Sequence, residues 1–189
     1  MEMMKRTFDL ILAAFASIVL LIPALVVAIL VHLTSRGPIL YWSARVGRNN
    51  RVFEMPKFRS MQIGTPEVAT HILSNPDKYL TPIGSFIRRS SLDELPQLWS
   101  IIVGEMSFVG PRPALFNQYD LIALRTQYGL EKLVPGLTGW AQVNGRDELP
   151  VEKKVDFDME YLKRQSIFFD IKIIFLTALR VIQRDNVIH

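Results

Sequence analysis

The chain has 189 residues, of which 22 are lysine or arginine and 18 are aspartate or glutamate, and its formal net charge is +4. The absence of cysteine excludes disulfide bonds and thiolate catalysis. The 3 histidines lack the spacing of a structural zinc site. The length fits one domain, and the positive charge suits an anionic partner, namely nucleic acid, acidic lipid or a phosphorylated substrate.

A long apolar segment dominates the N-terminal part of the chain. Only His32 interrupts the uncharged run from Leu10 to Leu33, and about 20 apolar residues suffice to cross a bilayer. We therefore predict a membrane helix at about residues 8–33. Pro23 favours a kink near its middle, and basic residues flank both ends, so neither flank is an obvious choice for translocation. A kinked re-entrant helix and a single-pass helix both fit this pattern.

The following segment has the pattern of a β-hairpin. Residues 39–46 and 52–55 are rich in β-forming side chains, and the intervening residues 47–50 favour a turn. Lys57 and Arg59 come next at alternate positions, so an extended backbone directs both cations to one side. These cations fit either an exposed basic edge strand or a site for an anion.

A polar loop and a short helix are predicted after the hairpin. Residues 62–80 carry no clear period, and we expect a loop there with one helical turn around His71. Thr81 then resembles a helix N-cap followed by proline at the first helical position. A helix over residues 82–89 would carry Arg88 near its end. Its apolar face would comprise Ile83, Phe86 and Ile87.

The adjacent carboxylates of Asp93 and Glu94 are the strongest candidates for chemistry. Arg88 precedes the pair and Arg112 follows it, and the arginine fork matches phosphate oxygens, so the pattern favours phosphate chemistry. The same residues also fit a helix capping box, in which Ser91 binds the backbone N–H of Glu94 and receives a bond in return. In that interpretation Asp93 merely complements the helix dipole.

Pro96 limits how the helix that follows these acids can begin. It cannot donate to the carbonyl of Leu92, so either the first turn is irregular or the helix starts nearer Pro96. Residues 98–103 are apolar nearly all round, and Gly104 is a plausible helix stop. Arg112 then stands between two prolines. The prolines restrict its backbone, which suits a preorganised phosphate site.

The C-terminal part is predicted to be helical apart from one loop. Helices are expected over residues 114–128, 151–165 and 167–182. The last of them suits either the membrane interface or core packing. Residues 135–146 have spaced glycines, as in loops that carry ligand contacts, but they match neither GxxxxGK[ST] nor GxGxxG. The candidate contacts in this loop are Gln142, Asn144 and Arg146.

Four motifs in order now resemble a known family. They are Lys57-Phe-Arg-Ser-Met61, Ser91-Leu-Asp-Glu-Leu-Pro-Gln-Leu98, Met106-Ser-Phe-Val-Gly-Pro-Arg-Pro113 and Pro135-Gly-Leu-Thr-Gly-Trp-Ala-Gln-Val-Asn-Gly-Arg146. Over about residues 3–185 the chain resembles the bacterial sugar transferases called monotopic phosphoglycosyl transferases. Four motifs in register are far more specific than any one of them. The expected fold is α+β and mostly α, with a kinked re-entrant membrane helix, a β-hairpin and a compact set of cytoplasmic and interfacial helices.

The resemblance also implies a reaction. Members of this family transfer a phospho-sugar from a UDP-sugar to a polyprenol phosphate such as undecaprenyl phosphate, through a covalent aspartyl-phosphosugar intermediate, and release UMP. This is the first membrane step of glycoconjugate assembly. Residues 1–189 would then be a single catalytic domain. It would lie at the cytoplasmic face of the bacterial cytoplasmic (inner) membrane, in contact with phospholipid and without a nucleic-acid partner.

Site roles follow from the same resemblance. The family's Asp-Glu dyad maps onto Asp93, as nucleophile, and Glu94, as metal or general-base support. Mg²⁺ is the implied cofactor, with both carboxylates as candidate ligands. Two positions depart from the family pattern, since Ile22 stands where some members have serine and Glu105 where aspartate is common. The candidates for phosphate, nucleotide or sugar binding are Lys57, Arg59, Arg88, Arg112, Gln142, Asn144 and Arg146.

Other classes of protein explain less of the pattern. A membrane-tethered nucleic-acid or anionic-ligand binding protein without catalysis would use the same basic hairpin but would need neither acid. A glycosidase uses two carboxylates that act from opposite sides of a sugar, whereas adjacent acids near arginines suit phosphate better. A non-enzymatic membrane adaptor gives no reason for Asp93 and Glu94 to stand beside Arg88 and Arg112.

Overall fold

The computed structural model of the chain describes residues 2–66, 68, 75–145 and 149–185. Within these ranges the fold is mostly helical α+β, as predicted. The α-helices are α1 (Glu2–Val19), α2 (Leu21–Thr34), α3 (Gly84–Arg89), α4 (Leu98–Val103), α5 (Tyr119–Gln127), α6 (Trp140–Asn144), α7 (Val151–Arg164) and α8 (Ile167–Asp185). The strands are β1 (Leu40–Val46), β2 (Val52–Phe58), β3 (Ser107–Val109), β4 (Ala114–Leu115) and β5 (Gly136–Thr138). Short 3₁₀ helices are η1 (Arg48–Asn50), η3 (Pro76–Tyr79), η4 (Leu92–Gln97) and η5 (Leu130–Lys132).

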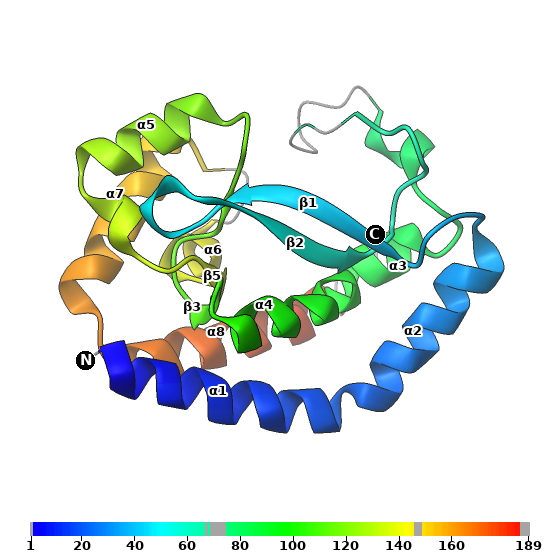
Figure 1. Cartoon of the computed structure of the whole chain (residues 1–189), viewed down its shortest axis with the longest axis horizontal. Coiled ribbons are helices and arrows are strands. Elements are labelled where there is room, and N and C mark those ends of the chain that lie inside the picture. Colours follow the sequence, from blue (N-terminus) through cyan, green and yellow to red (C-terminus); the bar gives the residue numbers. More distant parts are fainter. Residues whose placement is uncertain (1, 67, 69–74, 146–148, 186–189) are drawn as a thin grey trace.

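The predicted membrane helix is divided into two helices. Figure 1 shows α1 along one edge of the molecule and α2 turning away from it, and the two helices are bent by 61°. Leu20 separates them, three residues before Pro23, which has no N–H to donate to the carbonyl of Val19. The predicted kink is therefore confirmed. In the described ranges no single helix is long and apolar enough to cross a membrane, but the bent pair passes that test together by length and composition.

The N-terminal half of α1 is fixed to the rest of the domain by polar side chains. Lys5 pairs with Asp170 of α8 at 2.6 Å. Arg6 donates to two carbonyl oxygens in the last turn of α4, at 2.5 and 2.7 Å. Asp9 is buried and accepts a hydrogen bond from the backbone N–H of Phe108 in β3. This face of α1 therefore belongs to the domain.

Other faces of α1 and α2 leave large apolar side chains exposed. An exposed apolar surface of this extent marks contact with lipid or with another protein. The most exposed of these side chains include Ile11, Phe15, Ile18, Ile22, Ile29 and Leu33. Helix α8 is similarly two-sided, since Phe169 and Ile173 are buried while Phe168 and Phe175 are exposed. The core-packing interpretation of residues 167–182 thus holds for one face of this helix, and the membrane-interface interpretation of the other face stays a prediction.

The central β-hairpin is confirmed. Strands β1 and β2 pair antiparallel from Leu40 opposite Phe58 to Val46 opposite Val52. Strand β4 adds to the other edge of β1. The prediction that the helix begins at residue 114 is wrong, because the pairing with β1 overrides the helical pattern, and α5 begins at Tyr119.

Two further predictions need correction. The stretch 135–146 is not simply a loop, because β5 pairs in parallel with β3 and α6 follows it. Helix α3 begins at Gly84, without the predicted cap, since the hydroxyl of Thr81 lies 3.3 Å from the carbonyl oxygen of Ser60. Phe86, expected on the apolar face, is exposed. The helical turn predicted around His71 lies outside the described residues.

Three apolar clusters hold these elements together. The largest joins α1, β2, α4, β3 and the helices α6 to α8, through residues such as Met55, Ile101 and Ile173. A second cluster packs α2 against the end of β2 and against α3, around Phe58 and Ile87. The third joins β4, α5 and α7. The end of β2 is thereby placed beside η4 and α2, where the candidate acids lie.

Candidate active site

The adjacent acids lie on η4 and are not held by the predicted capping box. Ser91 precedes η4 with a left-handed backbone (φ 58°), and its side chain makes no capping hydrogen bond. The capping-box prediction is therefore wrong. The limit that Pro96 sets on the start of the helix is confirmed, since Leu92–Gln97 is a 3₁₀ helix that contains this proline and α4 begins only at Leu98.

The carboxylate of Glu94 is held by two cations instead. Lys57 Nζ and Arg112 Nη2 each lie 3.1 Å from the same oxygen, Oε1. Burial by itself would raise the pKa of Glu94, but the charges of Lys57 and Arg112 and their hydrogen bonds hold it at about 2. Glu94 is therefore an anion that joins β2 to the segment between β3 and β4.

Asp93 is the more basic of the two acids. Its side chain is buried, and this burial raises its pKa to about 6, which the neighbouring charge of Glu94 reinforces. Lys57, Arg88 and Arg112 oppose the rise. At neutral pH Asp93 is thus ionised, and its carboxylate is more basic than that of an ordinary surface aspartate.

Five of the predicted site residues form one group, which we call the charge cluster: Lys57, Arg88, Asp93, Glu94 and Arg112. They come from β2, the end of α3, η4 and the segment between β3 and β4. Lys57 is itself largely buried, and this burial lowers the pKa of its amine while Glu94 opposes the shift. Cations arranged around carboxylates in this way can bind a phosphate group and neutralise charge on its oxygens.

Arg59 lies apart from the charge cluster. Its guanidinium donates to the carbonyl oxygens of Ser35 and Arg36 and to the hydroxyl of Ser35, at the end of α2. Lys57 donates to Glu94 instead, so the two cations of this segment are held by different partners. Arg59 therefore fastens α2 to the hairpin.

The candidates of the third segment are placed on α6. Gln142 donates from Nε2 to the carbonyl oxygen of Leu137 at 3.1 Å, while its Oε1 is buried without a hydrogen-bond partner. Asn144 donates to the carbonyl oxygen of Trp140 at 2.7 Å. Both side chains thus bond to nearby backbone of their own segment. Arg146 lies outside the described residues.

A bound Mg²⁺ is compatible with the site only if the substrate completes its ligand shell. The part of the chain that the structure describes contains no group of three histidine, cysteine, aspartate or glutamate side chains able to hold a metal. Magnesium, however, is commonly bound by one or two carboxylates together with substrate phosphates and water. Asp93 is the stronger candidate ligand, because Oε1 of Glu94 already accepts from two cations.

The charge cluster thus combines two carboxylates with three cations, and its element η4 contacts α2 of the apolar helix pair. The chain belongs to the bacterial sugar transferase family, whose model matches residues 1–184. Sequence reasoning missed Arg125 and Asp158, although Arg125 donates to Asp158 and to the carbonyl oxygen of Arg112. The sequence did contain a sign of a buried charge. Asp158 lies three residues from both Val155 and Tyr161, on the buried face of α7.

Several known proteins are similar to this chain over nearly its whole length. A UDP-galactose-lipid carrier transferase of Erwinia amylovora is 42% identical over 198 residues, which cover 97% of this chain and 41% of that protein. A UDP-glucose:undecaprenyl-phosphate glucose-1-phosphate transferase of Escherichia coli is 41% identical over 95% of this chain and 40% of its own length. The chain thus spans about two fifths of these relatives. An uncharacterized sugar transferase of Bacillus subtilis, EpsL, is 36% identical over 97% of this chain and 90% of its own.

Proposed function

We propose that this chain is a phosphoglycosyl transferase, which moves a sugar 1-phosphate from a UDP-sugar to undecaprenyl phosphate or a similar polyprenol phosphate and releases UMP. The name of the Escherichia coli relative describes this type of substrate pair, and that of the Erwinia amylovora relative combines UDP-galactose with a lipid carrier. The observation that carries the proposal is the charge cluster, in which Asp93 and Glu94 lie among Lys57, Arg88 and Arg112. The whole chain would act as one catalytic domain.

In the first step, a carboxylate oxygen of Asp93 attacks the phosphorus that bears the sugar. A new oxygen–phosphorus bond forms, and the bond from this phosphorus to the bridging oxygen of the diphosphate breaks. UMP leaves with the bridging oxygen and the electron pair. The sugar phosphate stays on Asp93 as an acyl phosphate. The pKa of about 6 of the free Asp93 carboxyl suits the role of nucleophile, because this carboxyl is ionised at neutral pH and more basic than an ordinary aspartate.

In the second step, an oxygen of the polyprenol phosphate attacks the same phosphorus. The bond to the Asp93 oxygen breaks, so the carboxylate is regenerated and the sugar is carried on a polyprenyl diphosphate. An acyl phosphate is reactive, so this step needs no further activation of the leaving group. The two steps balance without an oxidant or an additional proton donor.

The other members of the charge cluster position and neutralise the phosphates. Lys57, Arg88 and Arg112 supply the donors, since positioning and electrostatics carry most of the catalysis of phosphoryl transfer. Glu94 is expected to orient Lys57 and Arg112, because a pKa of about 2 makes it a weak general base. Mg²⁺ held by Asp93 and Glu94 would supply additional positive charge at the diphosphate.

The position of the cluster suits a lipid-borne acceptor. The 3₁₀ helix η4, which carries both acids, contacts α2, the second half of the apolar helix pair. The phosphate of a polyprenol lies at the level of the lipid headgroups. We propose that α1 and α2 enter the cytoplasmic leaflet as a re-entrant pair, which would leave the polar face of α1 on the domain and the exposed apolar faces in lipid.

The test is an assay of UMP release by detergent-solubilised protein with Mg²⁺, undecaprenyl phosphate and a panel of UDP-sugars. The proposal predicts UMP with at least one of these sugars, in an amount matched by the lipid-linked sugar phosphate. Absence of UMP with every sugar, together with binding of nucleic acid that weakens steeply with salt, would favour the alternative of a membrane-tethered binding protein.

A further inference from the structure

Three consecutive carbonyl groups around Arg112 are held by three different elements. The oxygen of Pro111 accepts from the backbone N–H of Gly136 in β5 at 2.9 Å. The oxygen of Arg112 accepts from Arg125 Nη1 at 2.8 Å. The oxygen of Pro113 accepts from Arg45 Nη1 at 3.2 Å. The backbone of Arg112 is therefore fixed by contacts as well as by its two prolines.

Arg125 is itself fixed by a buried carboxylate. Its Nε and Nη2 atoms donate to Oδ2 of Asp158 in α7, at 2.9 and 2.7 Å. The Asp158 side chain is 2% exposed and that of Arg125 is 12% exposed. Three of the five guanidinium donors are thus committed. Of these three, Nε and Nη2 donate to Asp158, and Nη1 donates to the carbonyl oxygen of Arg112.

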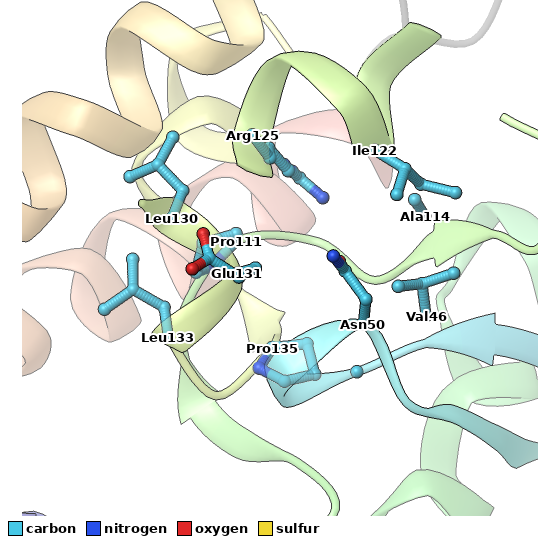
Figure 2. Close-up of a pocket in the computed structure, with 11 residues that line it drawn as sticks. Val46, Asn50, Pro111, Ala114, Ile122, Arg125, Leu130, Glu131, Leu133 and Pro135 are labelled. Carbon is cyan, nitrogen blue, oxygen red and sulfur yellow. The ribbon is translucent and has the colours of Figure 1, made fainter. Parts of the chain in front are cut away.

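Arg125 also lines a small cavity beside the hairpin. Figure 2 shows Arg125 extending from α5 toward Asn50 at the tip of the hairpin, above Pro111. A cavity of about 30 Å³ lies between these residues, which is room for about one water molecule. Asp158 accepts two of the three hydrogen bonds that hold the guanidinium beside this cavity.

We propose that Asp158 and Arg125 are positioning residues, which act through the Arg112 carbonyl to aim the Arg112 guanidinium at Glu94 and at the substrate phosphates. This inference rests on the proposed phosphoryl-transfer function. The ordered chain of contacts runs from Asp158 to Arg125, from Arg125 to the Arg112 backbone, and from the Arg112 side chain to Glu94 at 3.1 Å. A small displacement of a catalytic donor is sufficient to slow an enzyme strongly.

The experiment is a double-mutant cycle with UMP release as the readout. Asp158→Asn should lower kcat about tenfold and change KM less, because Arg112 is needed most as charge develops on the phosphoryl oxygens. In an Arg112→Gln background the same change should cost less than about twofold, since its target is already absent. Arg125→Lys, which retains the charge but not the fork, should behave like Asp158→Asn.

The matched control is Asp156→Asn, an exposed acid on the same helix whose partner is Lys153 at 3.4 Å. It should leave kcat unchanged in both backgrounds. Equal losses for Asp158→Asn in both backgrounds would overturn the inference, because a merely structural role lowers activity by the same factor with or without Arg112. An unchanged kcat in Asp158→Asn would also overturn it.

A second readout does not depend on activity. The NMR order parameter of the Arg112 Nε–H bond, measured in the ligand-free protein, should fall in Asp158→Asn and Arg125→Lys but not in Asp156→Asn. An unchanged order parameter in the first two variants contradicts the positioning role, even where thermal stability has changed. Failure of the wild-type protein to release UMP contradicts the proposed function instead, while the NMR result still decides the positioning role.

Discussion

Lys57 on β2 and Arg112 between β3 and β4 donate to the same carboxylate oxygen, each at 3.1 Å. The shared acceptor belongs to Glu94, so one carboxylate fixes the separation of two cations from distant parts of the chain. Without that negative charge the two cations would repel each other. The arrangement of the phosphate donors therefore depends on Glu94 as much as on the cations themselves.

Replacement of Glu94 by Gln tests this dependence. The amide keeps the shape of the side chain but removes the charge between Lys57 and Arg112, so we expect a loss of about a hundredfold in kcat for UMP release. The control is Glu105→Gln, which changes an exposed acid eleven residues further along the chain. This variant should retain wild-type activity. A Glu94→Gln variant with wild-type kcat would show that the carboxylate does not organise the cations.

Arg59→Met distinguishes an anchoring role from phosphate binding. The variant loses the hydrogen bonds to Ser35 and Arg36 at the end of α2, which should cost about 3 kcal/mol of stability. That loss corresponds to a fall of roughly 6–12 °C in Tm for a chain of this size. The KM for the UDP-sugar should stay close to wild type in the folded fraction.

The control for that prediction is Arg51→Met, since Arg51 is an exposed hairpin residue. It should change neither Tm nor KM. A large rise in KM for Arg59→Met with an unchanged Tm would contradict the anchoring role and restore Arg59 as a phosphate ligand.

Lys5→Met should make the stability of the protein depend more steeply on pH. Burial raises the pKa of Asp170 and Lys5 opposes this rise, so removal of Lys5 raises the folded-state pKa further above the unfolded value. A group whose pKa is higher in the folded than in the unfolded state contributes stability at pH values below its unfolded-state pKa. This contribution is lost as the pH rises through its folded-state pKa. The variant should thus lose up to about 3–5 kcal/mol at pH 8 and clearly less at pH 5.

Thermal unfolding at these two pH values provides the measurement. Lys153→Met, which removes an exposed lysine paired with Asp156, should show the pH dependence of the wild type. A Lys5→Met variant that is destabilised equally at pH 5 and pH 8 would mean that Asp170 is not the group responsible.

Removal of divalent metal tests the role assigned to the two acids. With EDTA present, UMP release should fall to background, because the diphosphate would lose the positive charge that Mg²⁺ supplies. Excess Mg²⁺ should restore the rate. Unchanged turnover in EDTA would contradict a Mg²⁺ site at Asp93 and Glu94.

Local signals account for the parts of the fold that were predicted correctly. The turn residues 47–50 predict the hairpin, and Pro23 predicts the bend between α1 and α2, because each effect acts within a few residues. The strands β4 and β5 were not predicted, since they contain only 2 and 3 residues and exist through pairing with partners distant in sequence.

The sequence indicated both acids and all three cations of the charge cluster. Adjacent carboxylates between arginines are visible in the sequence, but the hydrogen bonds of Arg59 to the end of α2 join residues far apart in the chain. The engagement of Glu94 by Lys57 and Arg112, in place of the capping box with Ser91, depends on the packing of β2 against η4. Periodicity along one segment carries no information on such contacts.

The most direct test of the account is intact-protein mass spectrometry, followed by peptide mapping, after addition of the UDP-sugar without polyprenol phosphate. We expect the wild-type protein to gain the mass of one phospho-sugar on the peptide that contains Asp93, and Asp93→Asn to gain none and to release no UMP. An adduct on another peptide, or turnover retained by Asp93→Asn, would contradict the role of Asp93 as the nucleophile.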